Sequence, residues 1–144
     1  MGGGTTSIAV FYDGHLVHVD SIPIGGMHVT SDIARGLSTP IADAERMKTL
    51  IGRARAKPND EYDIIDVPLI GEQERTTPNH VPRSILVGII RPRVEETFEL
   101  VRSRLEASGV DRLAGGRAVL VGGASQLDGL GDVAADILKT KVRI

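Results

Sequence analysis

The chain has 144 residues, of which 41% are hydrophobic and 25% are charged, and its net charge is −2. These values exclude an intrinsically disordered chain and give no sign of a general nucleic-acid binder, and the length suits one domain or two small lobes. Cysteine is absent, which excludes disulfides, thiolate metal sites and cysteine nucleophiles. No stretch has the pattern of a transmembrane helix or of a signal peptide, so we expect neither.

A β-hairpin is predicted near the start of the chain. Residues 8–12 are mostly β-branched or aromatic and contain no breaker, so they predict a strand. Asp13 and Gly14 then predict a type I′ turn, which needs positive φ at both central positions. Residues 15–24 supply the apolar side chains of the returning strand.

Two helices are predicted after the hairpin. Apolar residues recur every four positions over residues 29–37, which indicates a short helix. Thr39 and Pro40 predict the start of a second helix, because proline suits the first helical position. The buried stripe of that second helix is predicted at positions three and four apart, namely Met47, Leu50, Ile51 and Ala54.

The second half of the chain begins with a predicted strand and a long helix. Residues 62–70 predict the strand, and residues 71–82 are polar and proline-bearing, which favours a loop that could contain a short strand. The helix is expected within 84–108, with Pro92 either starting its regular part or kinking it. Gly109 suits the position just after its C-terminus. The buried stripe is predicted at Val94, Phe98, Val101 and Leu105.

A strand–turn–helix unit is predicted at the end of the chain. Residues 117–121 form the strand, residues 122–125 the glycine turn, residues 127–138 an amphipathic helix and residues 141–144 a final strand. The mixture of strands and helices predicts an α/β or α+β fold with a glycine-rich turn at each end.

Gly2, Gly3 and Gly4, followed by Thr5 and Thr6, form the first candidate site. Glycines let the backbone approach a phosphate closely and turn N–H groups toward an anion, and the two hydroxyls can donate further hydrogen bonds. A strand follows rather than a helix, which excludes a P-loop and the dinucleotide fingerprint. The alternative is a flexible terminal tail.

Two more groups are candidates for ligand binding. The Gly-Gly-Ala-Ser turn at 122–125 follows a buried strand, where strand–turn–helix units often bind a ligand. Its alternative is a simple tight turn. Glu45 and Lys48 lie three residues apart on one helix face, where they could bond a sugar and lie near a base. Their alternative is a solvated ion pair.

Charged residues also open the long helix, off its apolar stripe: Arg91, Arg93, Glu95 and Glu96. From the residues alone we interpret them as a solvated face. The four histidines have no metal-ligand spacing. Neither a Ser-His-Asp arrangement nor a catalytic carboxylate pair can be assembled, so no catalytic residue and no metal ligand is assigned.

Taken in order, these segments resemble the C-terminal half of FtsA, a family of bacterial actin-like cell-division proteins. The resemblance covers essentially the whole chain and rests on residues 2–11, 22–26, 29–34, 44–48, 90–96 and 119–127. It implies an α/β fold in which a ribonuclease H-like actin-type lobe, subdomain 2A, is interrupted by a small α+β subdomain, 2B. The implied boundaries are 1–38 for the first part of 2A, 39–90 for 2B, and 91–144 for the connecting helix and the second part of 2A.

The resemblance also implies one half of an ATP site that lies in a cleft between two lobes. The matching positions are Gly2, Gly3, Gly4, Thr5 and Thr6 for the second phosphate loop, Glu45 and Lys48 for the helix beside the ribose and base, and Gly122, Gly123 and Ala124 for the adenosine loop. We expect ATP with Mg²⁺ in the full-length protein. The fragment alone should bind it weakly or not at all and should not hydrolyse it, because phosphoryl transfer needs groups on both sides of the γ-phosphate.

The implied partner is the C-terminal tail of FtsZ, the tubulin-like ring protein. Arg93 and Glu96 match the 2B surface that receives this tail, and Arg83 matches a position implicated in self-association. The family is expected to link the FtsZ ring to the membrane and to recruit other division proteins, in the cytoplasm at the inner face of the membrane at the division site. Membrane attachment is expected only through a C-terminal helix that is absent here.

The chain departs from the family pattern at several points. The aspartate that precedes the glycines in the family is absent, Val121 stands where threonine is usual, and the whole first lobe is missing. We therefore expect a fragment. The alternative is the second lobe of another actin-like ATPase, of the pilus-assembly or reactivase type, with a different partner.

Overall fold

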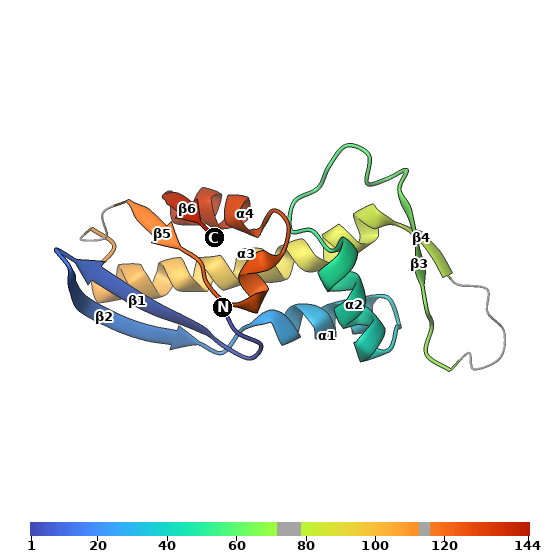
Figure 1. Ribbon diagram of the computed structural model, residues 1–144, viewed down its shortest axis with the longest axis horizontal. Coiled ribbons are helices and arrows are strands. Elements are labelled where there is room, and N and C mark those ends of the chain that lie inside the picture. Colours follow the sequence, from blue (N-terminus) through green and yellow to red (C-terminus); the bar gives the residue numbers. More distant parts are fainter. Residues whose placement is uncertain (72–78, 113–115) are drawn as a thin grey trace.

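The computed structural model describes residues 1–71, 79–112 and 116–144. Helix α3 (Arg83–Ser108) runs along the length of the molecule (Figure 1). Strands β1 (Thr6–Tyr12) and β2 (His15–Ile22) and helix α1 (Gly26–Gly36) lie on one side of it. The other elements are α2 (Ile41–Ile51), β3 (Ile64–Val67), β4 (Asn79–Pro82), β5 (Arg117–Val119), the 3₁₀ turn η1 (Gly123–Gln126), α4 (Leu130–Leu138) and β6 (Lys141–Arg143).

The predicted hairpin is confirmed. Strands β1 and β2 pair antiparallel, with Thr6 opposite Ile22 and a register shift after Val10. The turn between them has φ of 50° at Asp13 and 76° at Gly14, which are the positive values that a type I′ turn requires.

Helix α2 begins one residue later than predicted and differs in its buried stripe. Pro40 is the N-cap rather than the first helical residue. Ala44 and Met47 are buried, but Leu50 is 68% exposed, so its predicted burial is wrong. The reason is that α2 packs against α1 through the Ala44–Met47 side, which leaves Leu50 beside the cavity described below.

The predicted strand at 62–70 is shorter in the structure, and a short strand does follow it. β3 pairs antiparallel with β4, with Ile65 opposite Val81. Ile65 and Val67 point into the core while Ile64 is exposed, as expected for a half-buried strand. Residues 72–78 of the predicted loop lie outside the described residues.

Helix α3 starts earlier than the sequence suggests and continues through Pro92 without ending. Proline removes the hydrogen bond to the carbonyl four residues before it, which belongs to Gly88. Gly88 is exposed, so its carbonyl oxygen can accept a hydrogen bond from water instead. Gly109 ends the helix with φ of 73°, as predicted. Val94, Phe98 and Val101 are buried as predicted, while Leu105 is only partly buried.

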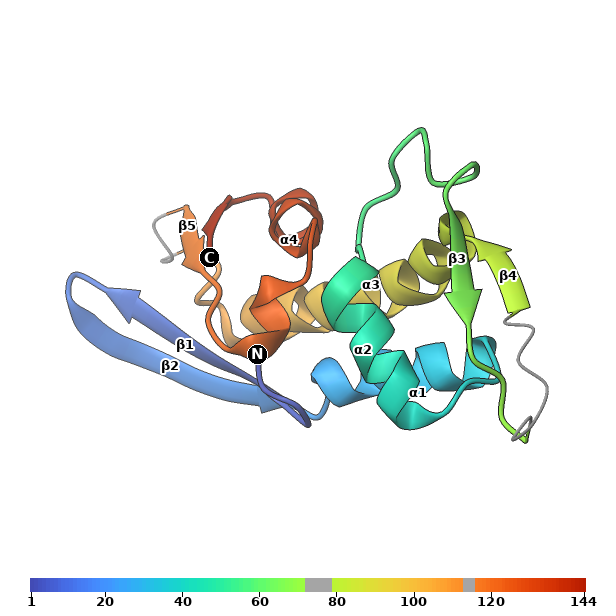
Figure 2. The same cartoon turned by 45° about the vertical axis from the view of Figure 1, so that its right-hand side comes forward.

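The end of the chain forms the predicted strand–turn–helix–strand unit. β5 and β6 pair in parallel, with Ala118 opposite Val142, and η1 and α4 connect them. Figure 2 shows α4 above α3, on the opposite side from the β1–β2 hairpin. The mixed α/β class is therefore confirmed.

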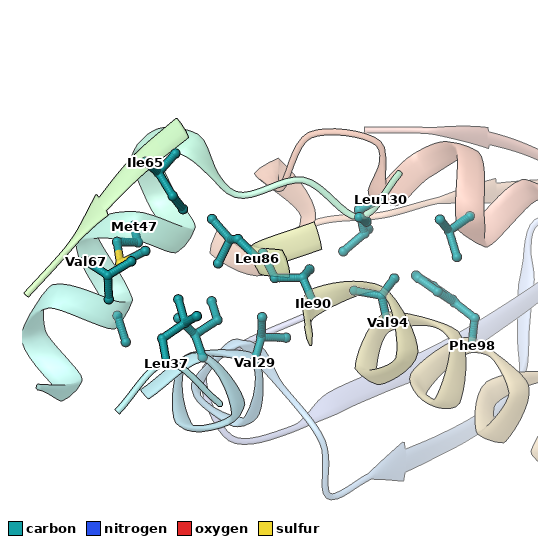
Figure 3. Close-up of a cluster of buried hydrophobic side chains, with 14 of the residues drawn as sticks. Val29, Leu37, Met47, Ile65, Val67, Leu86, Ile90, Val94, Phe98 and Leu130 are labelled. Carbon is teal, nitrogen blue, oxygen red and sulfur yellow. The ribbon is translucent and has the colours of Figure 1, made fainter. Parts of the chain in front are cut away.

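One apolar cluster holds these elements together (Figure 3). It combines residues of α1, α2, β3, α3 and α4, with Phe98 and Ile90 of α3 among its largest fully buried members. The cluster thus takes residues from all three segments of the predicted division at 38 and 90, and α3 crosses residue 90 unbroken. That division stays a prediction. None of the helices in the described ranges is long and apolar enough to cross a membrane.

Candidate functional site

The first glycine loop is held in place by the backbone. The carbonyl oxygen of Gly2 accepts the N–H of Gly26 at 2.8 Å, and the carbonyl oxygen of Gly3 accepts the N–H of Met27 at 2.8 Å. The N–H of Gly2 donates to the carbonyl of Thr5 at 2.9 Å. The loop is therefore fixed against the first turn of α1, and the alternative of a flexible tail does not hold.

Gly25 is the residue that lets these two segments meet. A Cβ atom at this position would lie 2.5 Å from the carbonyl oxygen of Gly2 and 2.6 Å from that of Gly3. Both neighbours are backbone atoms, which cannot swing away as the end of a side chain can. The close approach of the glycine loop to α1 therefore requires glycine here, for lack of space rather than for φ.

Glu45 and Lys48 join α2 to the start of α1. Nζ of Lys48 donates to Oε2 of Glu45 at 2.7 Å, to Oγ1 of Thr30 at 2.9 Å and to the carbonyl oxygen of Gly26 at 3.2 Å. The Thr30 hydroxyl also contacts Oε2 of Glu45. The hydrogen bonds from Lys48 and Thr30 lower the pKa of the Glu45 carboxyl, so Glu45 is ionised at neutral pH. This is a built cluster rather than a solvated ion pair.

The second glycine loop lies beside the first. Gly122 has φ of 99°, which favours glycine, and its carbonyl accepts the hydroxyl of Ser125 at 2.7 Å. The N–H of Ala124 donates to the carbonyl of Met1 at 3.4 Å. The chain start lies next to η1 in both ribbon views (Figures 1 and 2).

A cavity of about 500 Å³ brings the predicted groups together. Six predicted ligand-binding residues line it, two from each segment: Gly2, Gly3, Glu45, Lys48, Gly123 and Ala124. Its volume lies in the range of small-molecule sites. Three segments that are far apart in the sequence thus line one cavity.

Four predicted residues do not line this cavity: Gly4, Thr5, Thr6 and Gly122. Thr6 is buried, and its hydroxyl donates to the carbonyl of Ile24 at 2.8 Å. Because its hydroxyl already donates to this carbonyl, Thr6 stabilises the loop and is not available to donate to a ligand. Gly122 shapes the second loop through its φ.

Sequence reasoning missed several residues at this site. Gly25, Gly26 and Gln126 line the cavity, and Thr30 lies behind its lining, where its hydroxyl accepts from Lys48. The Gly25-Gly26 pair was a visible signal, since two adjacent glycines after a strand suggest a close approach of backbone. The role of Thr30 could not be predicted from the sequence, because it depends on a contact between two helices.

The predicted partner-binding residues lie in two different places. Arg93 forms two hydrogen bonds with the carboxylate of Asp32 on α1, at 2.6 and 3.1 Å, and a third with Glu96 at 2.6 Å. These acidic groups raise the pKa of Arg93. Arg83 pairs with Asp63 at 3.0 Å and lines the cavity instead. The interpretation of Arg93 as part of a solvated face is wrong, because its guanidinium pairs with Asp32 of α1. The sequence does not reveal this contact.

No cluster of three or more histidines and carboxylates that could hold a metal occurs in residues 1–71, 79–112 and 116–144. The groups that line the cavity suit a different ligand. Glycine loops place backbone N–H groups next to an anion, and an ionised carboxylate accepts hydrogen bonds from hydroxyl groups. These residues fit a phosphate-bearing sugar compound.

Solved structures define the class of this fold. MreB5 of Spiroplasma citri bound to AMPPNP superposes with a TM-score of 0.77 at 22% identity, covering 100% of this chain and 46% of that one. A PilM–PilN type IV pilus biogenesis complex gives 0.70 at 22% identity, covering 99% of this chain and 32% of that one. At such identities the likeness shows the fold alone. The chain has the actin-like ATPase fold.

Sequence comparison gives the family. The family model described as cell division protein FtsA matches residues 1–144. FtsA of Rhizobium meliloti is 56% identical and FtsA of Bacillus subtilis 39% identical, each over the whole chain. The chain belongs to the FtsA family of cell division proteins. It spans 33% and 32% of the length of these two relatives.

Proposed function

We propose that this chain forms one wall of an ATP site in an FtsA-type cell division protein. The observation that carries this proposal is the convergence of three separate segments on one cavity: residues 2–3, residues 45 and 48, and residues 123–124. The fixed glycine loop would face the phosphates, and Glu45 would accept a sugar hydroxyl. The AMPPNP of the structurally similar MreB5 supports a nucleotide as the ligand.

Because this chain forms only one wall of the site, we expect it to bind ATP weakly and not to hydrolyse it. Gly2, Gly3, Gly4 and Gly123 are exposed to solvent, so water competes for every phosphate contact. Phosphoryl transfer needs cationic or metal groups around the γ-phosphate and a positioned water, which one wall does not supply.

The test is the stabilisation of the folded chain by MgATP. A ligand that binds with a dissociation constant of about 1 mM, present at about 10 mM, raises the free energy of unfolding by roughly 1.4 kcal/mol. We expect a shift of this order in urea unfolding, a smaller shift with magnesium triphosphate, and no release of phosphate from ATP. No shift with MgATP would contradict the site, and magnesium-dependent phosphate release would contradict its description as one wall.

We further propose that the surface around Arg93 binds the acidic tail of FtsZ. Three of the five N–H groups of the guanidinium donate to Asp32 and Glu96, which leaves two for a further carboxylate. Glu96 is 51% exposed, so a partner can displace it at small cost. The link to the membrane, the recruitment of other division proteins, the location at the division site and self-association near Arg83 are proposed on the family alone.

Fluorescence anisotropy of a labelled FtsZ tail peptide tests this second proposal. We expect saturable binding that Arg93→Glu abolishes and that Arg91→Glu, a control on the same helix, leaves within about threefold. Arg91 is a matched control because it pairs with Glu95, one turn along the same helix, at 2.7 Å. Equal binding by the wild type and the Arg93→Glu variant would contradict the assignment of this surface.

A further inference from the structure

The ammonium group of Lys48 meets a protein acceptor with each of its three N–H groups. It donates to three protein acceptors: the carbonyl oxygen of Gly26, Oγ1 of Thr30 and Oε2 of Glu45. An ammonium group carries three donors, so these contacts use all of them. The Lys48 side chain is only 14% exposed, and breaking any of these bonds would leave a poorly solvated charge.

Thr30 connects Lys48 to Glu45. Its side chain is fully buried, and its oxygen accepts from Lys48. The single hydroxyl proton is donated to the charged acceptor, Oε2 of Glu45, in preference to the neutral carbonyl of Gly26 at 3.1 Å. Two donors, the ammonium group of Lys48 and the hydroxyl of Thr30, therefore hold the same carboxylate oxygen of Glu45.

The other oxygen of Glu45 is free to accept. Oε1 has no hydrogen-bond partner among the residues that the structure describes, and the Glu45 side chain is 47% exposed and lines the cavity. Both donors on Oε2 fix the rotation of the carboxylate, so the direction of Oε1 is fixed as well. A rigid, ionised acceptor of this kind suits a neutral hydroxyl donor.

Gly26 extends the same network to the glycine loop. Its carbonyl accepts from Lys48, and its N–H donates to the carbonyl of Gly2 at 2.8 Å. The loop proposed for the phosphates and the carboxylate proposed for the sugar are thus tied to one residue.

From these contacts we infer that Thr30 is a positioning residue of the nucleotide site, and that Lys48 acts with it as a clamp on Glu45 and Gly26. Thr30 and Lys48 together aim Oε1 of Glu45 at the hydroxyls of a ribose. This inference rests on the proposed nucleotide function, but the network itself can be tested without any nucleotide.

The first test is the titration of the Glu45 carboxyl by carbon-13 NMR in the chain without ligand. Hydrogen bonds from Lys48 and Thr30 lower its pKa in the wild type. We expect Thr30→Val to raise this pKa toward the ordinary glutamate value and Thr30→Ser to restore it. Thr39→Val is the matched control, because Thr39 is equally buried and its hydroxyl has no partner in the described part of the chain. An unchanged pKa in Thr30→Val would overturn the inference.

The second test compares ATP with 2′,3′-dideoxy-ATP as stabilisers of the folded chain. We expect the wild type to bind ATP about tenfold more tightly, the size of one hydrogen bond to a charged group. Thr30→Val should lose this preference and keep its affinity for the dideoxy compound, and Thr30→Ala carries the same test if the valine variant does not fold. An equal loss of affinity for both nucleotides would mean that Thr30 has a merely structural role, and it would overturn the inference on Thr30 alone. No stabilisation of the wild type by either nucleotide would overturn the proposed function itself.

Discussion

Replacing Phe98 with alanine is expected to lower the free energy of unfolding by about 3–5 kcal/mol, the range for a large buried aromatic side chain. Phe98 is 1% exposed and lies in the cluster that joins α3 to α4, in a chain with only two phenylalanines. Its removal leaves a cavity in the cluster to which Val94, Leu130 and Val133 also belong, and aliphatic side chains of fixed size cannot fill it. Urea unfolding followed by circular dichroism measures the loss.

Leu100→Ala on the same helix is the matched control for Phe98→Ala. Leu100 is 38% exposed, so its truncation removes less buried surface and is expected to cost under about 1.5 kcal/mol. Similar losses for the two variants would show that α3 does not pack as described.

Gly25→Ala is expected to have the largest effect on the candidate site. The new methyl group would overlap the carbonyl oxygens of Gly2 and Gly3, so the glycine loop must move away from α1. Overpacking of this kind costs about 1–3 kcal/mol, and the hydrogen bonds from Gly26 and Met27 to the loop would be lost with it. Stabilisation of the folded chain by MgATP should disappear in this variant.

Gly88→Ala is the control for a glycine with room around it. A Cβ atom at Gly88 would meet nothing within 4 Å, and the residue lies inside α3. Alanine there is expected to stabilise the chain by about 0.5–1 kcal/mol and to leave the effect of MgATP unchanged. Retention of the MgATP effect in Gly25→Ala would mean that the loop geometry is not needed for binding.

Local patterns were sufficient to predict most of the fold. The Asp13-Gly14 turn, the end of α3 at Gly109 and the burial of Phe98 follow from backbone preference and from the spacing of apolar residues. Leu50 was misplaced because periodicity gives the width of an apolar stripe but not where a neighbouring element stops covering it.

Local patterns marked the segments of the candidate site but left a terminal tail, a tight turn and a solvated ion pair as alternatives, and the resemblance to the FtsA family selected the residues. Glycine runs and the Glu-x-x-Lys spacing are visible in the sequence, and they mark segments that the structure gathers around one cavity. The pairing of Arg93 with Asp32, 61 residues apart, and the bond between Thr30 and Lys48 depend on how helices pack. No local signal in the sequence contains that information.

A map of backbone amide NMR shifts on titration with MgATP tests whether the three segments form a single nucleotide site. We expect the largest changes to fall on three separate segments, around Gly3, around Glu45 and around Gly123, and all three to saturate with one dissociation constant. Changes confined to one segment, or spread over the charged surface of α3, would contradict a single nucleotide site built from all three.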